Sequence, residues 1–149
     1  MHYFLDTEFN GHGGELISLV LVEGNGGREL YLYTPMKRTP HVWVKENVIP
    51  IIECVGAKPT VIDPWQFGHL IAGFLRLDPT PVIITDWPDD ISYFCKCLIT
   101  GPGQMVTISN LIFQMFRVDS YPTTLPGAVQ HNALWDARAL RHKLENGTN

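Results

Sequence analysis

The stretch "YFLDTEFN", residues 3–10, decides the fold of this chain because it joins an apolar run to a pair of acids. The opening "YFL" is typical of a buried strand, and we expect the first strand to cover residues 2–6. Asp6 and Glu8 are two residues apart, so their side chains point to the same face at the strand's end. Neighbouring carboxylates repel each other and are costly to desolvate, so this pair requires a compensating partner.

The strands expected after this stretch begin with an antiparallel meander. The turn residues of "NGHGG" and "EGNGG" separate the apolar runs "ELISLVLVEG" and "RELYLYTP". The run "TPVIIT" is typical of a buried parallel strand, and "MVTIS" predicts a fifth strand. The expected strands after the first are therefore 15–24, 28–35, 80–85 and 105–109.

Helical spacing of apolar residues appears in the remaining segments. Asp63 and Pro64 favour a helix start, and Gly101 favours a helix end. The prolines of 121–129 indicate a loop. The expected helices are 41–49, 65–77, 89–100, 110–116 and 132–145. Three strands followed by alternating strands and helices predict an α/β fold, with a mixed five-stranded sheet flanked by helices.

Composition limits the class of protein. The 149 residues are 45% hydrophobic and 17% charged, which predicts one globular domain over 1–145 and a flexible tail over 146–149. The apolar runs are too short to cross a bilayer, and the N-terminus lacks a secretion signal, so we expect no membrane and a cytoplasmic location. Three cysteines, Cys54, Cys95 and Cys97, fit reduced thiols. A net charge of −4 disfavours a protein that coats long nucleic acid.

Further acids lie where an α/β sheet gathers its ligand sites. Asp86 and Asp90 follow the strand at 80–85, and Asp136 lies in the last helix, five residues after His131. Such sites form at strand ends and helix starts. Carboxylate ligands favour Mg²⁺ or Mn²⁺ over Zn²⁺, and two ions about 3.5–4 Å apart can stabilise both oxygens of a phosphodiester displacement. A histidine of ordinary pKa suits the general base.

These residues carry a resemblance to a known family. "DTEF", "DDISYF" and "HNALWDA" resemble the three motifs of the DEDDh 3′–5′ exonuclease superfamily, which includes ribonuclease T, oligoribonuclease and proofreading subunits. The chain is most similar to its small bacterial and phage exoribonucleases. The resemblance implies a ribonuclease-H-like fold, a homodimer and two metal ions. It also implies a catalytic set of Asp6, Glu8, Asp90, His131 and Asp136, whose four acids bind the metal.

The spacing distinguishes between variants of this family. The tyrosine variant would place Tyr where this chain has Asn132, whereas the histidine variant requires the interval from His131 to Asp136 found here. The family often has Asn four residues before its second Asp, but this chain has Asp86 there. Asp86 therefore competes with Asp90 as the metal ligand of the second motif.

Two aromatic residues are candidate substrate contacts. Phe9 matches a family position beside the terminal base, and Trp87 lies at the expected mouth of the site; an ordinary core phenylalanine remains an alternative for Phe9. The other tryptophans are expected in the core: Trp43, Trp65 and Trp135.

The sequence thus predicts a metal-dependent 3′–5′ exoribonuclease that releases nucleoside 5′-monophosphates from single-stranded RNA 3′ ends. A DNA exonuclease of the proofreading or repair type is the alternative enzyme. A catalytically silent nucleic-acid-binding module is the alternative from another class. Individual residues also have simpler readings: solvated acids at a strand end for Asp6 and Glu8, helix capping for Asp89 and Asp90, and a surface position for His131.

Overall fold

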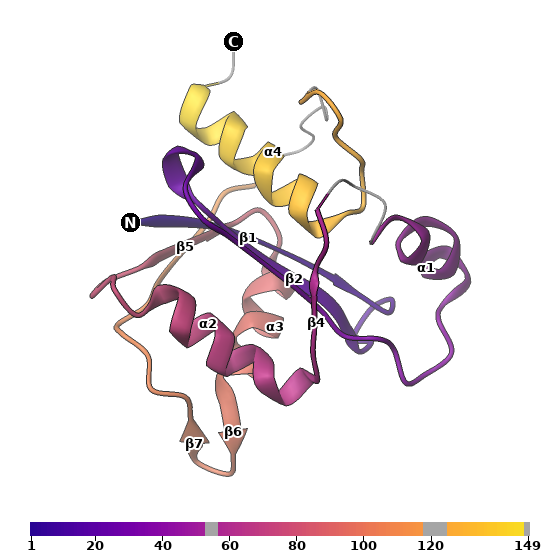
Figure 1. The fold of residues 1–149 in the computed structure, drawn as a ribbon, viewed down its shortest axis with the longest axis horizontal. Helices are drawn as coiled ribbons and strands as arrows, with labels where there is room; N and C mark the ends of the chain where they lie inside the picture. The colour runs from indigo at the N-terminus through magenta and orange to yellow at the C-terminus, as the bar shows by residue number, and fades with distance from the viewer. Residues whose placement is uncertain (53–56, 118–124, 148–149) are drawn as a thin grey trace.

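A mixed six-stranded sheet forms the centre of the computed structural model, which describes residues 1–52, 57–117 and 125–147 (Figure 1). The strand order is β4-β3-β2-β1-β5-β8. The strands are β1 (His2–Phe9), β2 (Leu16–Glu23), β3 (Glu29–Tyr33), β4 (Thr60–Val61), β5 (Val82–Thr85) and β8 (Ile112–Met115). A separate two-stranded hairpin contains β6 (Ile99–Gly101) and β7 (Gln104–Met105).

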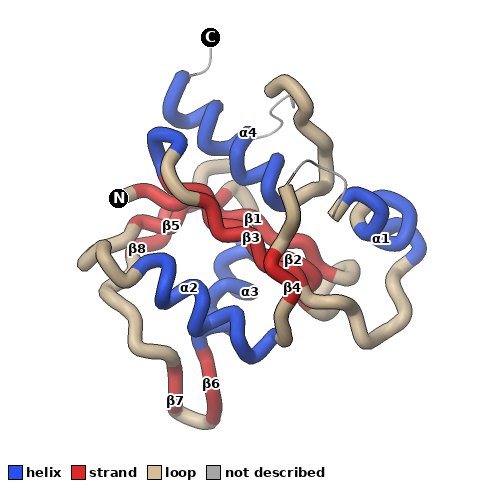
Figure 2. The backbone as a smooth tube through the Cα atoms, in the orientation of Figure 1, coloured by secondary structure: helices blue, strands red, loops and turns tan. Residues whose placement is uncertain are grey.

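Four α-helices and three short 3₁₀ segments complete the described fold (Figure 2). The helices are α1 (Val42–Asn47), α2 (Phe67–Leu75), α3 (Pro88–Leu98) and α4 (Ala133–Asn146). The 3₁₀ segments are η1 (Gly24–Gly26), η2 (Ile49–Ile51) and η3 (Pro64–Gln66). None of the helices in the described ranges is long and apolar enough to cross a membrane.

Strand β1 lies inside the sheet, antiparallel to β2 and parallel to β5. Successive side chains of a strand point to opposite faces, and β1 therefore contributes to two cores. Phe4 packs with α4 on one face, whereas Tyr3 and Leu5 pack on the other face with residues of α2 and α3. Figure 1 shows α4 on one side of the sheet and α2 and α3 on the other. The predicted α/β class and the helix-flanked mixed sheet are confirmed.

Two apolar runs were assigned to the wrong elements, and one short strand was not predicted. Residues 105–109 form no sheet strand; only Met105 is paired, in the β6–β7 hairpin, and Val106 is buried in the core as irregular chain. Residues 110–116 contain strand β8 instead of a helix, and Phe113 of β8 packs edge-on against Phe94. A seven-residue apolar run fits either element by periodicity alone. The two-residue β4 adds the sixth strand.

The helix ends also differ from expectation in two places. Helix α3 stops at Leu98 because Ile99 is already extended (φ −82°, ψ 123°) and continues into β6, so Gly101 does not end the helix. Helix α4 continues through Asn146.

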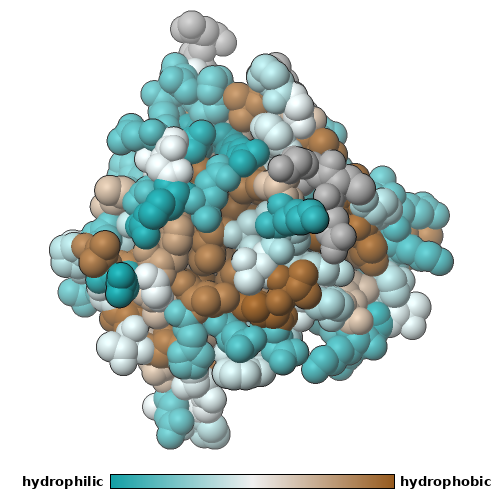
Figure 3. All heavy atoms as spheres, in the orientation of Figure 1, coloured by the Kyte–Doolittle hydropathy of each residue, from teal (hydrophilic) through white to brown (hydrophobic). Residues whose placement is uncertain are grey.

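Some of the predictions concern residues outside the described ranges. These are residues 148–149 of the expected tail, residues 121–124 of the expected loop, and Cys54. Cys95 and Cys97 are free thiols. Hydrophilic side chains cover α4, and apolar side chains show between α4 and α2 (Figure 3).

Helices α2 and α3 are positioned by a close approach at Gly68. A Cβ at this position would overlap the carbonyl oxygen of Cys97 and lie 3.2 Å from a methyl of Val106. Gly73, in the same helix, is exposed and has open space around it. The absence of a side chain at Gly68 therefore allows the two helices to pack.

We expect Gly68→Ala to lower the free energy of unfolding by about 2 kcal/mol, because the chain must shift to relieve the overlap. Gly73→Ala is the matched control, and it should raise that free energy by about 0.5–1 kcal/mol through helix propensity. Urea unfolding of both variants measures the difference. Equal stability of the two variants would contradict the close approach.

Candidate metal centre

The sheet brings acids from separate strands to one edge. β1 and β5 are parallel, with Phe4 opposite Ile84, so their carboxyl ends lie at the same edge of the sheet. Asp6 and Glu8 lie in the second half of β1, and Asp86 directly follows β5. Asp6 is opposite Val20 in the β1–β2 register, on the face covered by α4.

Helix α4 brings Asp136 to the same edge because its first turn is firmly capped. The side chain of Asn132 accepts a hydrogen bond from the backbone N–H of Trp135 at 3.3 Å, and its Nδ2 donates to the hydroxyl of Tyr31 at 3.0 Å. The Nδ2 also donates to the carbonyl of Ile51. The buried Asn132 therefore ties the start of α4 to β3 and η2, and Asp136 follows one turn later.

His131 has a left-handed backbone conformation, with φ at 61°. Its backbone N–H donates to Oδ2 of Asp136 at 3.1 Å. The imidazole meets the ring of Trp43 edge to face, with centroids 4.8 Å apart. A positive φ is uncommon for a residue other than glycine, so these contacts hold His131 in place beside Asp136.

Asp90 lies in the first turn of α3, and its carboxylate is only 2% exposed. Its Oδ1 accepts the backbone N–H of Thr7 at 3.1 Å and the hydroxyl of Thr7 at 2.6 Å. Its Oδ2 accepts the hydroxyl of Thr85 at 2.6 Å. Thr7 lies between Asp6 and Glu8, so these bonds join the helix start directly to the strand that carries the first two acids.

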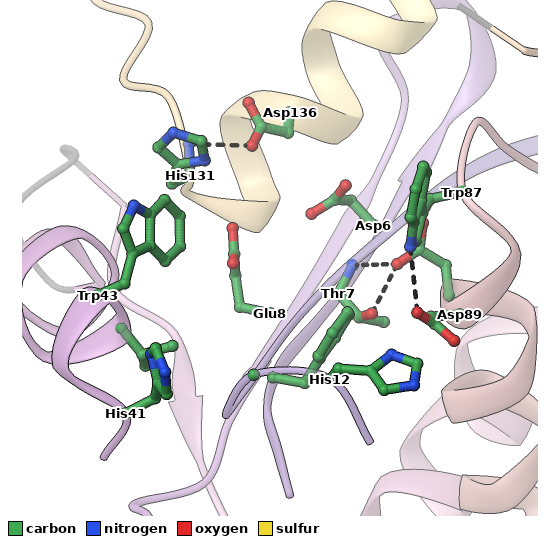
Figure 4. A pocket seen from close by; sticks show the side chains of 14 residues that line it. Asp6, Thr7, Glu8, His12, His41, Trp43, Trp87, Asp89, His131 and Asp136 are labelled. Carbon is green, nitrogen blue, oxygen red and sulfur yellow. Dashed lines mark hydrogen bonds between the residues drawn. The ribbon is translucent and has the colours of Figure 1, made fainter. Parts of the chain in front are cut away.

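Five carboxylates converge to form what we call the acidic cluster: Asp6, Glu8, Asp86, Asp90 and Asp136. It contains two overlapping groups, Asp6–Glu8–Asp136 and Asp6–Asp86–Asp90. In each group, one oxygen from every carboxylate lies within 4.8 Å of the others. Asp6 belongs to both groups and stands between them. Figure 4 shows Asp6, Glu8 and Asp136 with their carboxylates turned toward a common space.

Burial and mutual repulsion disfavour the charged form of the cluster. Burial, followed by the charge of Asp90, raises the pKa of Asp6 well above its usual range, and burial and Asp136 do the same to the pKa of Glu8. Burial raises the pKa of Asp90 to about 6, although the bonds from Thr7 and Thr85 oppose the shift. Burial likewise raises the pKa of Asp136 to about 7.

The donor set matches a hard divalent cation. Every side chain of the two groups contributes oxygen, which is the ligand that Mg²⁺ and Mn²⁺ prefer. Each of the two oxygen groups has a geometry that could hold such an ion, and the positive charge would offset the repulsion described above. The predicted acids Asp6, Glu8, Asp90 and Asp136 are all present in these groups, together with the competitor Asp86.

A pocket of about 500 Å³ opens over the acidic cluster. Its wall includes Phe9 and Trp87, the two predicted substrate contacts. Phe9 stacks on Tyr93 with centroids 4.7 Å apart, so one of its faces is already covered. Trp87 is 48% exposed. The sequence suggested that Asp89 caps α3, but its side chain makes no capping bond. It accepts the indole N–H of Trp87 at 3.2 Å instead.

Three of the residues that line the pocket were not predicted from the sequence. His12, His41 and Trp43 also line the pocket. Trp43 is 46% exposed and Trp65 is 67% exposed, so the expectation that both are core residues was wrong. Helical spacing could have predicted the exposure of Trp43, because Val44 and Val48 are one turn apart and both are buried. A residue beside Val44 on that helix points about 100° away from the core.

Without metal, the raised pKa values predict a pH-dependent stability. The folded state binds more protons than the unfolded state between the ordinary carboxyl pKa of about 4 and the folded values of about 6 and 7. The free energy of unfolding therefore falls as pH rises through this window. In EDTA, the melting temperature should be lower at pH 7.5 than at pH 5, and Asp6→Asn should reduce the difference. A melting temperature that rises over this interval in the parent protein would contradict this expectation.

Bound metal should reverse this loss at pH 7.5. We expect saturating Mn²⁺ to raise the melting temperature by roughly 5–10 °C when its concentration is a hundredfold above its Kd. Asp6→Asn should bind Mn²⁺ less tightly and show a smaller rise, because both oxygen groups lose a charged ligand. Asp63→Asn, at an exposed position outside the pocket, is the matched control. Calorimetric titration provides the Kd, and heats equal to buffer dilution would rule out the site.

Comparison with known proteins adds no assignment to this geometry. No protein-family model matches the chain, and no curated protein matches it significantly.

Proposed function

We propose that this protein is a metal-dependent 3′–5′ exonuclease acting on single-stranded nucleic acid, with RNA as the preferred substrate. The observation that carries the proposal is the convergence of four acids of the cluster with His131 in the lining of one pocket, while Asp86 belongs to the cluster outside that lining. The four acids are Asp6, Glu8, Asp90 and Asp136. The acids come from β1, the segment around the start of α3, and α4, in the order in which the resembling motifs occur. The mixed, helix-flanked sheet is compatible with the ribonuclease-H-like fold that we propose with it.

The chemistry would be hydrolysis of the last phosphodiester bond. Divalent cations held by the acidic cluster would supply Lewis-acid stabilisation of the charge that develops on the phosphate oxygens. His131 would accept the proton of the attacking water, whose oxygen forms the new bond to phosphorus. The bond to the 3′ oxygen of the preceding nucleotide breaks, and that oxygen takes a proton from solvent. The products are a nucleoside 5′-monophosphate and a strand shortened by one nucleotide.

The contacts around His131 suit its role as the general base. Asp136 accepts the backbone N–H of His131, which orients the residue without using either nitrogen of the imidazole. Trp43 holds the ring edge to face.

The pocket's aromatic side chains are suited to stacking against unpaired bases, because every base has a π-face and single strands expose it. Single-stranded substrates are therefore favoured over duplexes.

The test is digestion of 5′-labelled RNA and DNA of equal sequence in Mg²⁺ or Mn²⁺, with products resolved to single nucleotides and EDTA as the metal-free reference. We expect stepwise shortening from the 3′ end, faster on RNA. Asp6→Asn should reduce the rate by about a hundredfold or more, because it removes a ligand of both oxygen groups. Asp63→Asn should digest as fast as the parent protein. Faster digestion of DNA would favour the proofreading or repair type.

His131→Ala tests the general base. Loss of such a group costs about a hundredfold or more in rate. His69→Ala, at an exposed histidine outside the pocket, is the matched control. A His131→Ala protein that digests RNA at the parent rate would remove His131 from the mechanism, while full activity in Asp6→Asn would overturn the proposed metal chemistry itself.

A further inference from the structure

Trp87 is exposed and yet held in one orientation. Its indole N–H donates to Oδ2 of Asp89 at 3.2 Å, and its backbone N–H donates to the hydroxyl of Thr85 at 3.2 Å. The guanidinium of Arg117 lies over the ring, 5.4 Å from its centroid. The bond to Asp89 and the contact with Arg117 orient the ring itself, and with 48% of its surface exposed Trp87 offers an aromatic surface in the pocket wall.

Arg117 reaches this position through the sheet. β8 is parallel to β5, with Met115 opposite Thr85, and the backbone N–H of Phe116 donates to the carbonyl of Thr85. The chain after β8 therefore leaves the sheet beside the chain after β5. Burial raises the pKa of Asp86, and the nearby positive charge of Arg117 opposes that shift. Arg117 thus places a cation at the Asp86 end of the acidic cluster.

The end of the pocket opposite Trp87 contains a histidine and a second tryptophan. His131 and Trp43 stand together beside Glu8 and Asp136, and Figure 4 shows Trp87 on the opposite side of Asp6. Asp136 belongs to the oxygen group that contains Glu8, whereas Asp86, the chain neighbour of Trp87, belongs to the other group. Trp87 lines the pocket, and Arg117, which does not line it, contacts the Trp87 ring. The site therefore runs from a histidine end to a tryptophan end that Arg117 adjoins.

This asymmetry sets the direction of the strand if the proposed function holds. In an in-line displacement, the attacking and leaving oxygens lie on opposite sides of phosphorus. The water that transfers its proton to His131 approaches from the histidine end. The leaving 3′ oxygen, and the strand attached to it, must then lie toward Trp87 and Arg117.

We propose that Trp87 and Arg117, which we call the Trp87 platform, bind the nucleotide immediately upstream of the cleaved bond. Its base stacks on the exposed part of the Trp87 ring, and its 5′ phosphate pairs with the Arg117 guanidinium. The released nucleotide is attached to phosphorus through its 5′ oxygen, which is neither the attacking nor the leaving oxygen, and it does not touch the platform. This inference rests on the proposed function for its direction, because only the hydrolytic reaction defines an upstream side.

Two substrates separate the platform from the catalytic chemistry. One is a single-stranded oligonucleotide, and the other is the same strand with an abasic sugar immediately upstream of the cleaved bond, which keeps the phosphates but has no base for Trp87 to stack. Trp87→Ala should raise KM for the intact oligonucleotide about tenfold, the size of a lost base stack. It should change KM for the abasic strand by no more than about twofold, because that strand has no base to lose. Trp65→Ala, at an exposed tryptophan outside the pocket, is the matched control and should change neither.

Arg117→Gln should raise KM for both strands, because the abasic strand keeps the phosphate that pairs with Arg117. Removal of one phosphate contact should reduce the slope of log affinity against log salt by about one. A second readout is independent of turnover. In an Asp6→Asn background, which suppresses cleavage, fluorescence anisotropy of a 5′-labelled strand in Mg²⁺ should show about tenfold weaker binding when Trp87→Ala is added.

The outcomes are distinct. Equal losses caused by Trp87→Ala on the intact and the abasic strand, or strand binding that is unchanged by Trp87→Ala, would overturn the platform. If the parent protein cleaves neither substrate, the exonuclease proposal fails. A loss of strand binding on Trp87→Ala would then still support the platform as a strand-binding surface.

Discussion

Repulsion among the carboxylates of the acidic cluster is the constraint on which the site depends. Burial and like charge both favour protonation of Asp6 and Glu8, and the strand that carries these residues lies between two others. β1 cannot turn its acids into solvent without withdrawing Phe4 or Leu5 from the cores on the two faces of the sheet. The packing energy of those cores therefore holds together charges that would separate in a flexible chain.

Neutral hydrogen-bond donors make this arrangement tolerable and rigid. Thr7 and Thr85 fix both oxygens of Asp90, and Asn132 fixes the turn from which Asp136 projects. Each of these residues is buried. Donors of this kind stabilise an ionised carboxylate without adding a charge of their own, so the Thr7 and Thr85 bonds oppose the rise that burial causes in the pKa of Asp90. Pre-ordered ligands also lose less conformational entropy on binding.

The walls of the pocket give the site a direction. Trp43 and His131 form one end, from α1 and the residue before the Asn132 cap of α4. Trp87 forms the other end from the segment after β5, and Arg117, from the segment after β8, contacts its ring from outside the lining. Both aromatic residues are roughly half exposed, although tryptophan is usually well buried. Aromatic surface on both sides of an acidic, oxygen-rich floor suits a substrate that combines phosphate with planar bases.

The sequence by itself determined the elements with strong local signals. The alternation of "YFLDTEF", the meander turns and the apolar stripe of α4 act over a few residues, and these elements are present in the structure. The first strand, expected over 2–6, continues to Phe9 because its pairing with β2 extends past Glu8. The five-residue interval from His131 to Asp136 is also local, and it corresponds to a direct hydrogen bond. Only tertiary structure decided between helix and strand for residues 110–116, because pairing with β5 outweighs an ambiguous apolar pattern. That pairing brings Arg117 beside Trp87, and the parallel strand ends bring Asp86 and Asp90 to Asp6. Distances between residues far apart in the chain depend on register and helix placement, which no local pattern encodes.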